Sequence, residues 1–130
     1  MKRILVVDDD PAVRNMLTEV LQERYAVIEA SNGAEALDAM RQGPPDAVVL
    51  DMVMPVMDGR TFLRAYRTQP RFAQVPVMVV SAEPTACEDS RRLGAQACVP
   101  KPFDLDSLAS ALDRLVGGTT RGSLEDPPAS

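Results

Sequence analysis

The stretch Ile4-Leu5-Val6-Val7-Asp8-Asp9-Asp10-Pro11 joins an apolar run to three consecutive carboxylates and a proline. Four apolar residues without polar alternation are typical of a strand that is buried on both faces of a parallel sheet. Asp10 is a favourable N-cap residue, and Pro11 stands where proline is preferred in the first helical turn. The stretch therefore predicts a buried strand that passes directly into a helix, with acidic side chains at the junction.

The same strand-and-helix pattern continues along the chain. Further strands are predicted at Tyr25–Ala30, Ala47–Leu50, Pro76–Val80 and Ala97–Val99, and segments of helical periodicity or helix-start and helix-stop signals follow each of them. Strands that are separated by helices pair in parallel through right-handed crossovers. We therefore predict an α/β fold of five βα units, a doubly wound five-stranded parallel sheet in the strand order 2-1-3-4-5 with helices on both faces.

The chain has 130 residues, the size of one domain. Residues 1–116 carry the predicted strands and helices and are assigned to that domain. Residues 117–130 are rich in Gly, Ser, Thr and Pro, which predicts a flexible tail or a truncated linker.

Composition excludes several kinds of chemistry. With a net charge of −5, this domain alone is not expected to bind nucleic acid. The chain has no histidine, so histidine bases and ligands are excluded. No apolar run has the length of a membrane span or the form of a signal peptide, so no membrane contact and a cytoplasmic location are expected. The two cysteines, Cys87 and Cys98, are therefore expected to be reduced thiols, with Cys98 a small buried hydrophobic residue.

Polar residues stand at the predicted strand ends. Asp8 and Asp9 follow the first strand, Asp51 the third, Ser81 the fourth and Lys101 the fifth. Because ligands of such sheets bind outside the carboxyl ends of the strands, we expect these side chains to converge. Three carboxylates that converge require a cation, and oxygen ligands suit Mg²⁺. A carboxylate in such a pocket can act as a nucleophile toward phosphorus, while the lysine and the serine contact phosphoryl oxygens.

These motifs, in this order, resemble the response-regulator receiver domain of two-component signalling over residues 2–116. The matching stretches end a strand or follow one, and they are Ile4–Asp10, Val49–Gly59, Val79–Ala82, Gly94-Ala95 and Lys101–Phe103. The resemblance implies a signalling domain and not an enzyme, one that promotes only its own phosphorylation and dephosphorylation. It implies a sensor histidine kinase or phosphotransfer protein as phosphodonor and an output domain or effector protein downstream.

The resemblance also implies a role for each site residue. Asp51 would be the phosphoacceptor, assisted by Ser81 and Lys101. Asp9, Asp51 and the backbone carbonyl of Val53 would ligate Mg²⁺ directly, and Asp8 would act through a water. The peptide bond between Lys101 and Pro102 is expected to be cis, which X-Pro bonds permit at low cost.

Two features depart from the family pattern. Cys98 occupies the position of the usual switch aromatic, and the region of the fourth helix between Ser81 and Lys101 is short. The phosphorylation chemistry is thus expected to be intact while the switch face is atypical. Glu83, two residues after Ser81, flanks the expected path of a hydrolytic water.

Two alternatives stand beside the phosphoacceptor. The first is a receiver-like interaction scaffold that works without phosphorylation. The second is a hydrolase of the haloacid-dehalogenase kind, which requires a second carboxylate two residues after its nucleophile. Val53 stands at that place, which argues against the hydrolase.

Overall fold

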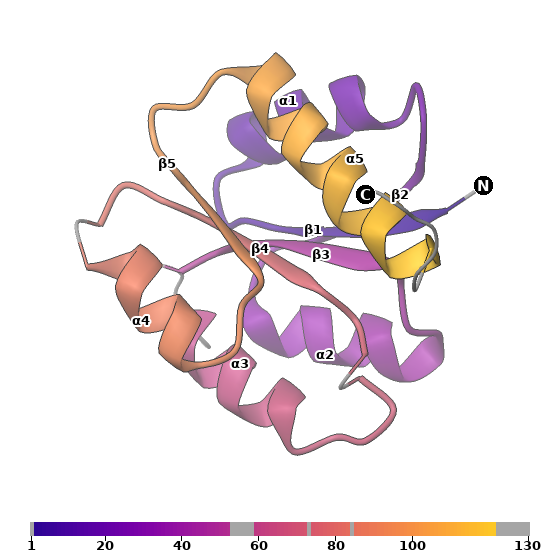
Figure 1. Cartoon of the computed structure of the whole chain (residues 1–130), viewed down its shortest axis with the longest axis vertical. Coiled ribbons are helices and arrows are strands. Elements are labelled where there is room, and N and C mark those ends of the chain that lie inside the picture. Colours follow the sequence, from indigo (N-terminus) through magenta and orange to yellow (C-terminus); the bar gives the residue numbers. More distant parts are fainter. Residues whose placement is uncertain (1, 53–58, 73, 84, 122–130) are drawn as a thin grey trace.

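Five strands alternate with five helices in the part of the chain that the computed structural model describes, residues 2–52, 59–72, 74–83 and 85–121 (Figure 1). The strands are β1 (Arg3–Val7), β2 (Ala26–Ala30), β3 (Ala47–Asp51), β4 (Val77–Ser81) and β5 (Ala97–Pro100). The helices are α1 (Pro11–Leu21), α2 (Gly33–Gln42), α3 (Gly59–Arg67), α4 (Ala86–Arg92) and α5 (Leu105–Arg121).

The strands form one sheet in the order β2-β1-β3-β4-β5, and each neighbouring pair is parallel. This confirms the predicted topology. The order places β1 and β3 side by side, with Val7 opposite Leu50, so the residues that follow or end these two strands share one edge of the sheet. The strand order reverses between β1 and β3, and ligands of such folds usually bind there, outside the carboxyl ends of the strands.

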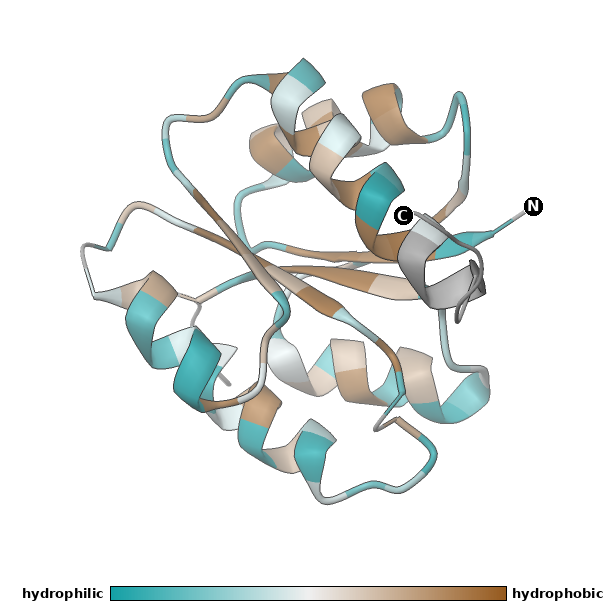
Figure 2. Ribbon diagram, viewed as in Figure 1, coloured by the Kyte–Doolittle hydropathy of each residue, from teal (hydrophilic) through white to brown (hydrophobic). Residues whose placement is uncertain are grey.

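Two apolar layers enclose the sheet, because side chains of a strand alternate between its faces. In β1, Ile4 and Val6 pack toward α1 and α5, whereas Leu5 and Val7 pack toward α2, α3 and α4. The central strands β3 and β4 are buried at every position. Figure 2 shows the result, hydrophobic strands between helices whose outer surfaces are hydrophilic.

Short polar residues cap the starts of α1 and α2, and the cap of α1 is the one that the sequence predicts. The Asp10 side chain accepts a hydrogen bond from the backbone N–H of Ala12, with Pro11 in the first turn of α1. Asn32 caps α2 by accepting from the backbone N–H of Glu35. The Glu35 carboxylate accepts in return from the N–H of Ser31, one residue before the cap. This hydrogen bonding lowers the pKa of Glu35.

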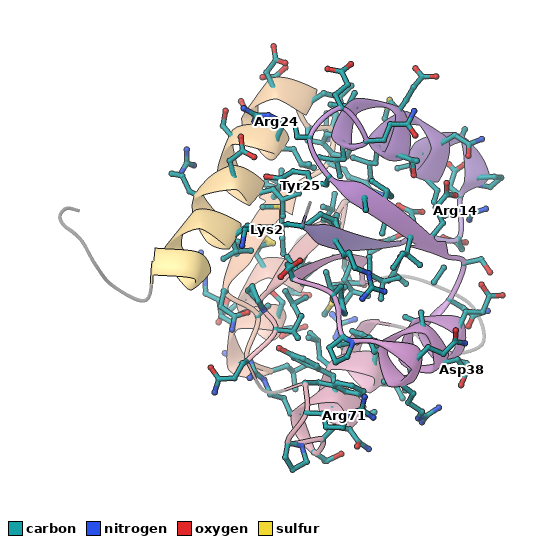
Figure 3. The ribbon with its side chains drawn as sticks, turned by 90° about the vertical axis from the view of Figure 1, so that its right-hand side faces the viewer. Lys2, Arg14, Arg24, Tyr25, Asp38 and Arg71 are labelled. Carbon is teal, nitrogen blue, oxygen red and sulfur yellow. A yellow bond between two sulfur atoms is a disulfide. The ribbon has the colours of Figure 1, made fainter. Side chains whose placement is uncertain are left out.

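The last helix is longer than predicted. α5 continues to Arg121, so residues 117–121 of the predicted tail are helical. A glycine in a helix costs only about 1 kcal/mol. Propagating a helix that is already packed is cooperative, so Gly117 is too weak a signal to end it. Figure 3 shows Arg24 and Tyr25 beside α5, where both side chains donate hydrogen bonds to Asp113.

One predicted core residue of α1 lies at the surface. Helical spacing predicts that Met16 shares one apolar face of α1 with Val13, Leu17, Val20 and Leu21, but its side chain is 40% exposed. Within the described residues, no helix is long and apolar enough to cross a membrane.

Candidate functional site

Asp8 and Asp9 follow the last residue of β1, and their surroundings differ. Asp8 is only 2% exposed, while Asp9 faces solvent. The Asp8 carboxylate accepts a hydrogen bond of 2.9 Å from the backbone N–H of Asp10, and its carbonyl accepts one of 2.8 Å from the guanidinium of Arg14. A buried carboxylate needs such donors, because burial without a partner is costly. Asp8 is therefore held in one orientation by the turn that begins α1.

Asp51 is the last residue of β3, a strand buried along its whole length, and is 7% exposed. One carboxylate oxygen each from Asp8, Asp9 and Asp51 lies within 4.8 Å of the others. The structure thus brings together the three carboxylates that the sequence predicted to converge. Three negative charges at this spacing repel one another strongly where the dielectric constant is low.

Lys101 supplies a positive charge to this cluster. Its Nζ lies 3.5 Å from Oδ2 of Asp8 and 3.6 Å from Oδ2 of Asp51. One ammonium against three carboxylates leaves a formal excess of negative charge, and the donors are all hard oxygen atoms. This donor set fits a divalent cation of the hard kind.

Ser81 ends β4, the strand beside β3, and it is buried. Asp51 is registered with Val80, so Ser81 lies one residue further along the neighbouring strand. The Ser81 hydroxyl accepts a hydrogen bond of 3.1 Å from the N–H of Glu83, and its carbonyl accepts one of 2.9 Å from the N–H of Lys101. The peptide bond between Lys101 and Pro102 is cis, as the resemblance implies.

The return of the chain toward this edge requires a glycine at position 59. A Cβ on Gly59 would lie 2.7 Å from the Cα of Met52 and 2.9 Å from the carbonyl oxygen of Asp51, both backbone atoms. The N–H of Gly59 donates to the carbonyl of Met52 at 3.0 Å. Val53, the predicted carbonyl ligand, lies outside the described residues.

Arg60, which the sequence reasoning missed, anchors Glu83. Its guanidinium forms ion pairs with Glu83 in the loop after β4 and with Asp89 on α4, the latter at 2.7 Å. The two hydrogen bonds raise the pKa of Arg60, and the Arg60 guanidinium lowers the pKa of Asp89. A single arginine early in a helix carries no sequence signal for such a role. Glu83 is therefore turned toward α3, a direction that sequence alone left open.

The expectation of two reduced thiols is wrong for this structure. Cys87 on α4 and Cys98 in β5 form a disulfide, with their Cα atoms 5.4 Å apart. Cys98 is half-buried and packs against the apolar layer that faces α2, α3 and α4, but it is not a fully buried hydrophobic residue. The reason is tertiary, because α4 packs directly on the edge strand β5 and places two positions that are 11 residues apart within bridging distance.

The chain belongs to the response-regulator family, because a family model described as the response regulator receiver domain matches residues 4–113. This confirms the resemblance drawn from the motifs. It makes the chain a signalling domain of two-component systems.

Curated relatives agree with this membership. Sporulation initiation phosphotransferase F of Bacillus subtilis strain 168 is 36% identical over 114 residues, which cover 87% of this chain and 92% of that protein. Response regulator MprA of Mycobacterium sp. strain KMS is 40% identical over 130 residues, which cover 98% of this chain and 56% of that protein. This chain thus spans about half the length of MprA.

A solved structure agrees with the fold. The signal receiver domain of a signal transduction histidine kinase from Syntrophus aciditrophicus superposes with a TM-score of 0.86. Its sequence is 30% identical, and the match covers 97% of this chain and 98% of that one.

Proposed function

We propose that this chain is a phosphoacceptor that takes a phosphoryl group on Asp51 in a Mg²⁺-dependent transfer. The observation that carries the proposal is the cluster of Asp8, Asp9 and Asp51 with the ammonium of Lys101 beside it. The donor would be the phosphohistidine of a sensor histidine kinase or phosphotransfer protein, or a small phosphodonor. Sporulation initiation phosphotransferase F, a relative matched over 92% of its length, is named as a phosphotransferase.

The transfer balances with groups that the site holds. A carboxylate oxygen of Asp51 attacks phosphorus, and the bond from phosphorus to the donor's nitrogen or oxygen breaks, with the electron pair leaving on the donor. Such transfers depend mainly on positioning and charge neutralisation. Asp51 suits the nucleophile because it ends a fully buried strand that pairs with β1 and β4, and because Asp51 itself is registered with Val80 of β4.

Mg²⁺ is proposed as the cofactor because the donor set fits it. Asp9, Asp51 and the carbonyl of Val53 would hold the ion directly, and Asp8 would do so through a water. When bound, the ion would neutralise the carboxylates and the phosphoryl oxygens.

Lys101 and Ser81 are proposed to receive the phosphoryl group. Lys101 already contacts Asp51 and would transfer this contact to a phosphoryl oxygen. The Ser81 hydroxyl accepts a hydrogen bond from Glu83, which leaves its own hydrogen free to be donated to a second phosphoryl oxygen. An apolar hollow beside Lys101, lined by Val13, Met16, Ala82, Pro102 and Phe103, is where a protein donor would approach.

Intact-protein mass spectrometry after incubation with acetyl phosphate and Mg²⁺ tests the proposal. The native chain should gain one phosphoryl group, and Asp51→Asn should gain none. Asp38→Asn is the matched control, because Asp38 is an exposed carboxylate on α2 and should leave incorporation unchanged (Figure 3). Equal labelling of Asp51→Asn and the native chain would overturn the proposal and favour a phosphorylation-independent interaction scaffold.

A further inference from the structure

The Cys87–Cys98 disulfide lies close to the proposed phosphorylation site. Cys87 is in the first turn of α4, and Cys98 is in the middle of β5, where it is registered with Val79. Neither cysteine is fully buried. Partly exposed disulfides are the ones that exchange readily with small thiols. In reducing compartments, disulfides are usually transient and redox-sensing rather than structural.

The disulfide closes a ring that contains both proposed phosphoryl-binding residues. From Ser81 the chain runs through a short loop to Cys87, crosses the disulfide to Cys98, and continues along β5 to Lys101. The N–H of Lys101 then donates to the carbonyl of Ser81 at 2.9 Å, which completes the ring. A displacement of Ser81 or of the start of α4 must therefore be accommodated within this ring.

Further contacts hold the same loop. The Ser81 hydroxyl is bonded to the N–H of Glu83, and Arg60 on α3 binds both Glu83 and Asp89. These contacts are individually weak and reversible, because the ion pairs are partly exposed. Among the links between α4 and its neighbours in the described residues, the disulfide is the covalent one. It is the link that would decide whether α4 can shift relative to β5.

We propose that Cys87 and Cys98 form a redox modification site that gates the phosphorylation switch. This inference rests on the function proposed for Asp51. In the oxidised form, the ring holds Ser81 and Lys101 in the arrangement described above, in which Lys101 contacts Asp8 and Asp51. In the reduced form, α4 is released from β5, and Ser81 can follow the phosphoryl group.

The chemistry is thiol–disulfide exchange with a low-molecular-mass disulfide as oxidant. One cysteine thiolate attacks the oxidant and expels one thiolate as a mixed disulfide forms. The second cysteine thiolate then attacks the protein sulfur of the mixed disulfide and expels the other thiolate. Two protein thiols and one small disulfide thus become one protein disulfide and two small thiols, and excess small dithiol reverses the reaction.

The gate must act in both directions, because coupling between two equilibria is reciprocal. If the disulfide weakens binding of a phosphoryl group, then a bound phosphoryl mimic must favour reduction of the disulfide by the same factor. Couplings of this kind are commonly about fivefold or more. A disulfide that only stabilised the fold would show neither effect.

The test uses the full chain in two redox forms. One sample is equilibrated with oxidised glutathione and the other with dithiothreitol, and thiol alkylation followed by mass spectrometry verifies the state of each cysteine. Calorimetry then measures the affinity for beryllofluoride in the presence of Mg²⁺. The reduced form should bind at least about fivefold more tightly. The double variant Cys87→Ser/Cys98→Ser is the matched control, because it has no thiol to form a disulfide or a mixed disulfide, and it should bind like the reduced form in either buffer.

The reciprocal measurement is the fraction of disulfide in a glutathione buffer with and without beryllofluoride, which should fall when the mimic is bound. Equal affinity in the two redox forms, or tighter binding by the oxidised form, would overturn the gate and leave the phosphoacceptor role standing. Thiols that stay free under oxidised glutathione would overturn the modification site. If neither redox form bound beryllofluoride or took up phosphate, the proposed function itself would fail.

Discussion

The acidic site at the ends of β1 and β3 and the region made by α4 and β5 belong to one domain, yet they are held differently. β3 is buried at all its positions, and Asp8 is fixed by backbone hydrogen bonds of the adjoining turn. β5 is an edge strand with half-exposed residues. The helix α4 is short, with a length of only seven residues. β5 pairs with β4 on one side only, and side-chain links, among them the Arg60 ion pairs and the disulfide, join α4 to its neighbours.

The firmly held acidic site suits the proposed chemistry, whereas the more weakly held α4–β5 region suits a conformational response. A site that must place three carboxylates within a few ångströms gains from central strands whose positions are fixed by pairing on both sides. A region that must move when the site is modified benefits from weaker links, because local opening of such a region costs little free energy. In this chain the switch face is therefore proposed to depend on bonds that salt, pH or redox conditions can alter.

The largest expected effect concerns the disulfide. Reducing it should lower the free energy of unfolding by about 3 kcal/mol, because the bond closes a short loop in the unfolded chain. Urea denaturation with and without dithiothreitol measures this difference. Cys98→Ser should match the reduced chain and be insensitive to dithiothreitol. An unchanged midpoint would show that the link between α4 and β5 carries little of the fold's stability.

A smaller effect is expected at the acidic site. Mg²⁺ at ten times its Kd should raise the free energy of unfolding by about 1.4 kcal/mol, because it binds the assembled carboxylates and not the dispersed ones. Thermal unfolding with and without Mg²⁺ measures this increment.

Asp9→Asn should lose the Mg²⁺ increment, and removal of one repelling charge should make its metal-free form more stable than the native chain. Asp10→Asn is the matched control, since asparagine still caps α1 and the increment should remain. If Asp9→Asn gained as much stability from Mg²⁺ as the native chain, Asp9 would not belong to the ligand set.

The smallest effect is expected from Arg60. Arg60→Ala should lower the Tm by at most about 3 °C, because its partners are partly exposed. Arg92→Ala, which removes a more exposed pair with Glu88, should lower it less. Differential scanning calorimetry compares the two variants. The opposite ranking would mean that the link from Arg60 to the loop after β4 does not stabilise that region.

The Arg60 effect should also depend on pH. Arg60 lowers the pKa of Asp89, so the pair stabilises the fold above the unfolded pKa of about 3.9, and this stability is lost as pH falls through the lowered value. The difference in Tm between the native chain and Arg60→Ala should therefore shrink in acid. A difference that stayed constant between pH 7 and acid would assign the effect to packing of the arginine side chain.

The sequence by itself determined the topology and the membership of the acidic site. Apolar runs such as Ile4–Val7 and Ala47–Leu50 must be buried on both faces, and parallel pairing through helices places their carboxyl ends together. That rule predicts the site residues, since each stands at the end of a strand, namely Asp8, Asp9, Asp51, Ser81 and Lys101. Capping of α1 by Asp10 could also be predicted, because it depends on neighbours in sequence.

Only the tertiary structure decided the contacts of α4. The pairing of Arg60 with Glu83 and Asp89, and of Cys87 with Cys98, joins side chains from different elements. Whether these side chains meet depends on how α4 packs on α3 and β5, and no periodic pattern in the sequence predicts that packing. The same holds for Met16, whose exposure the helical spacing of apolar residues does not predict. Strand ends are brought together by rules of topology, whereas contacts between side chains are set by packing.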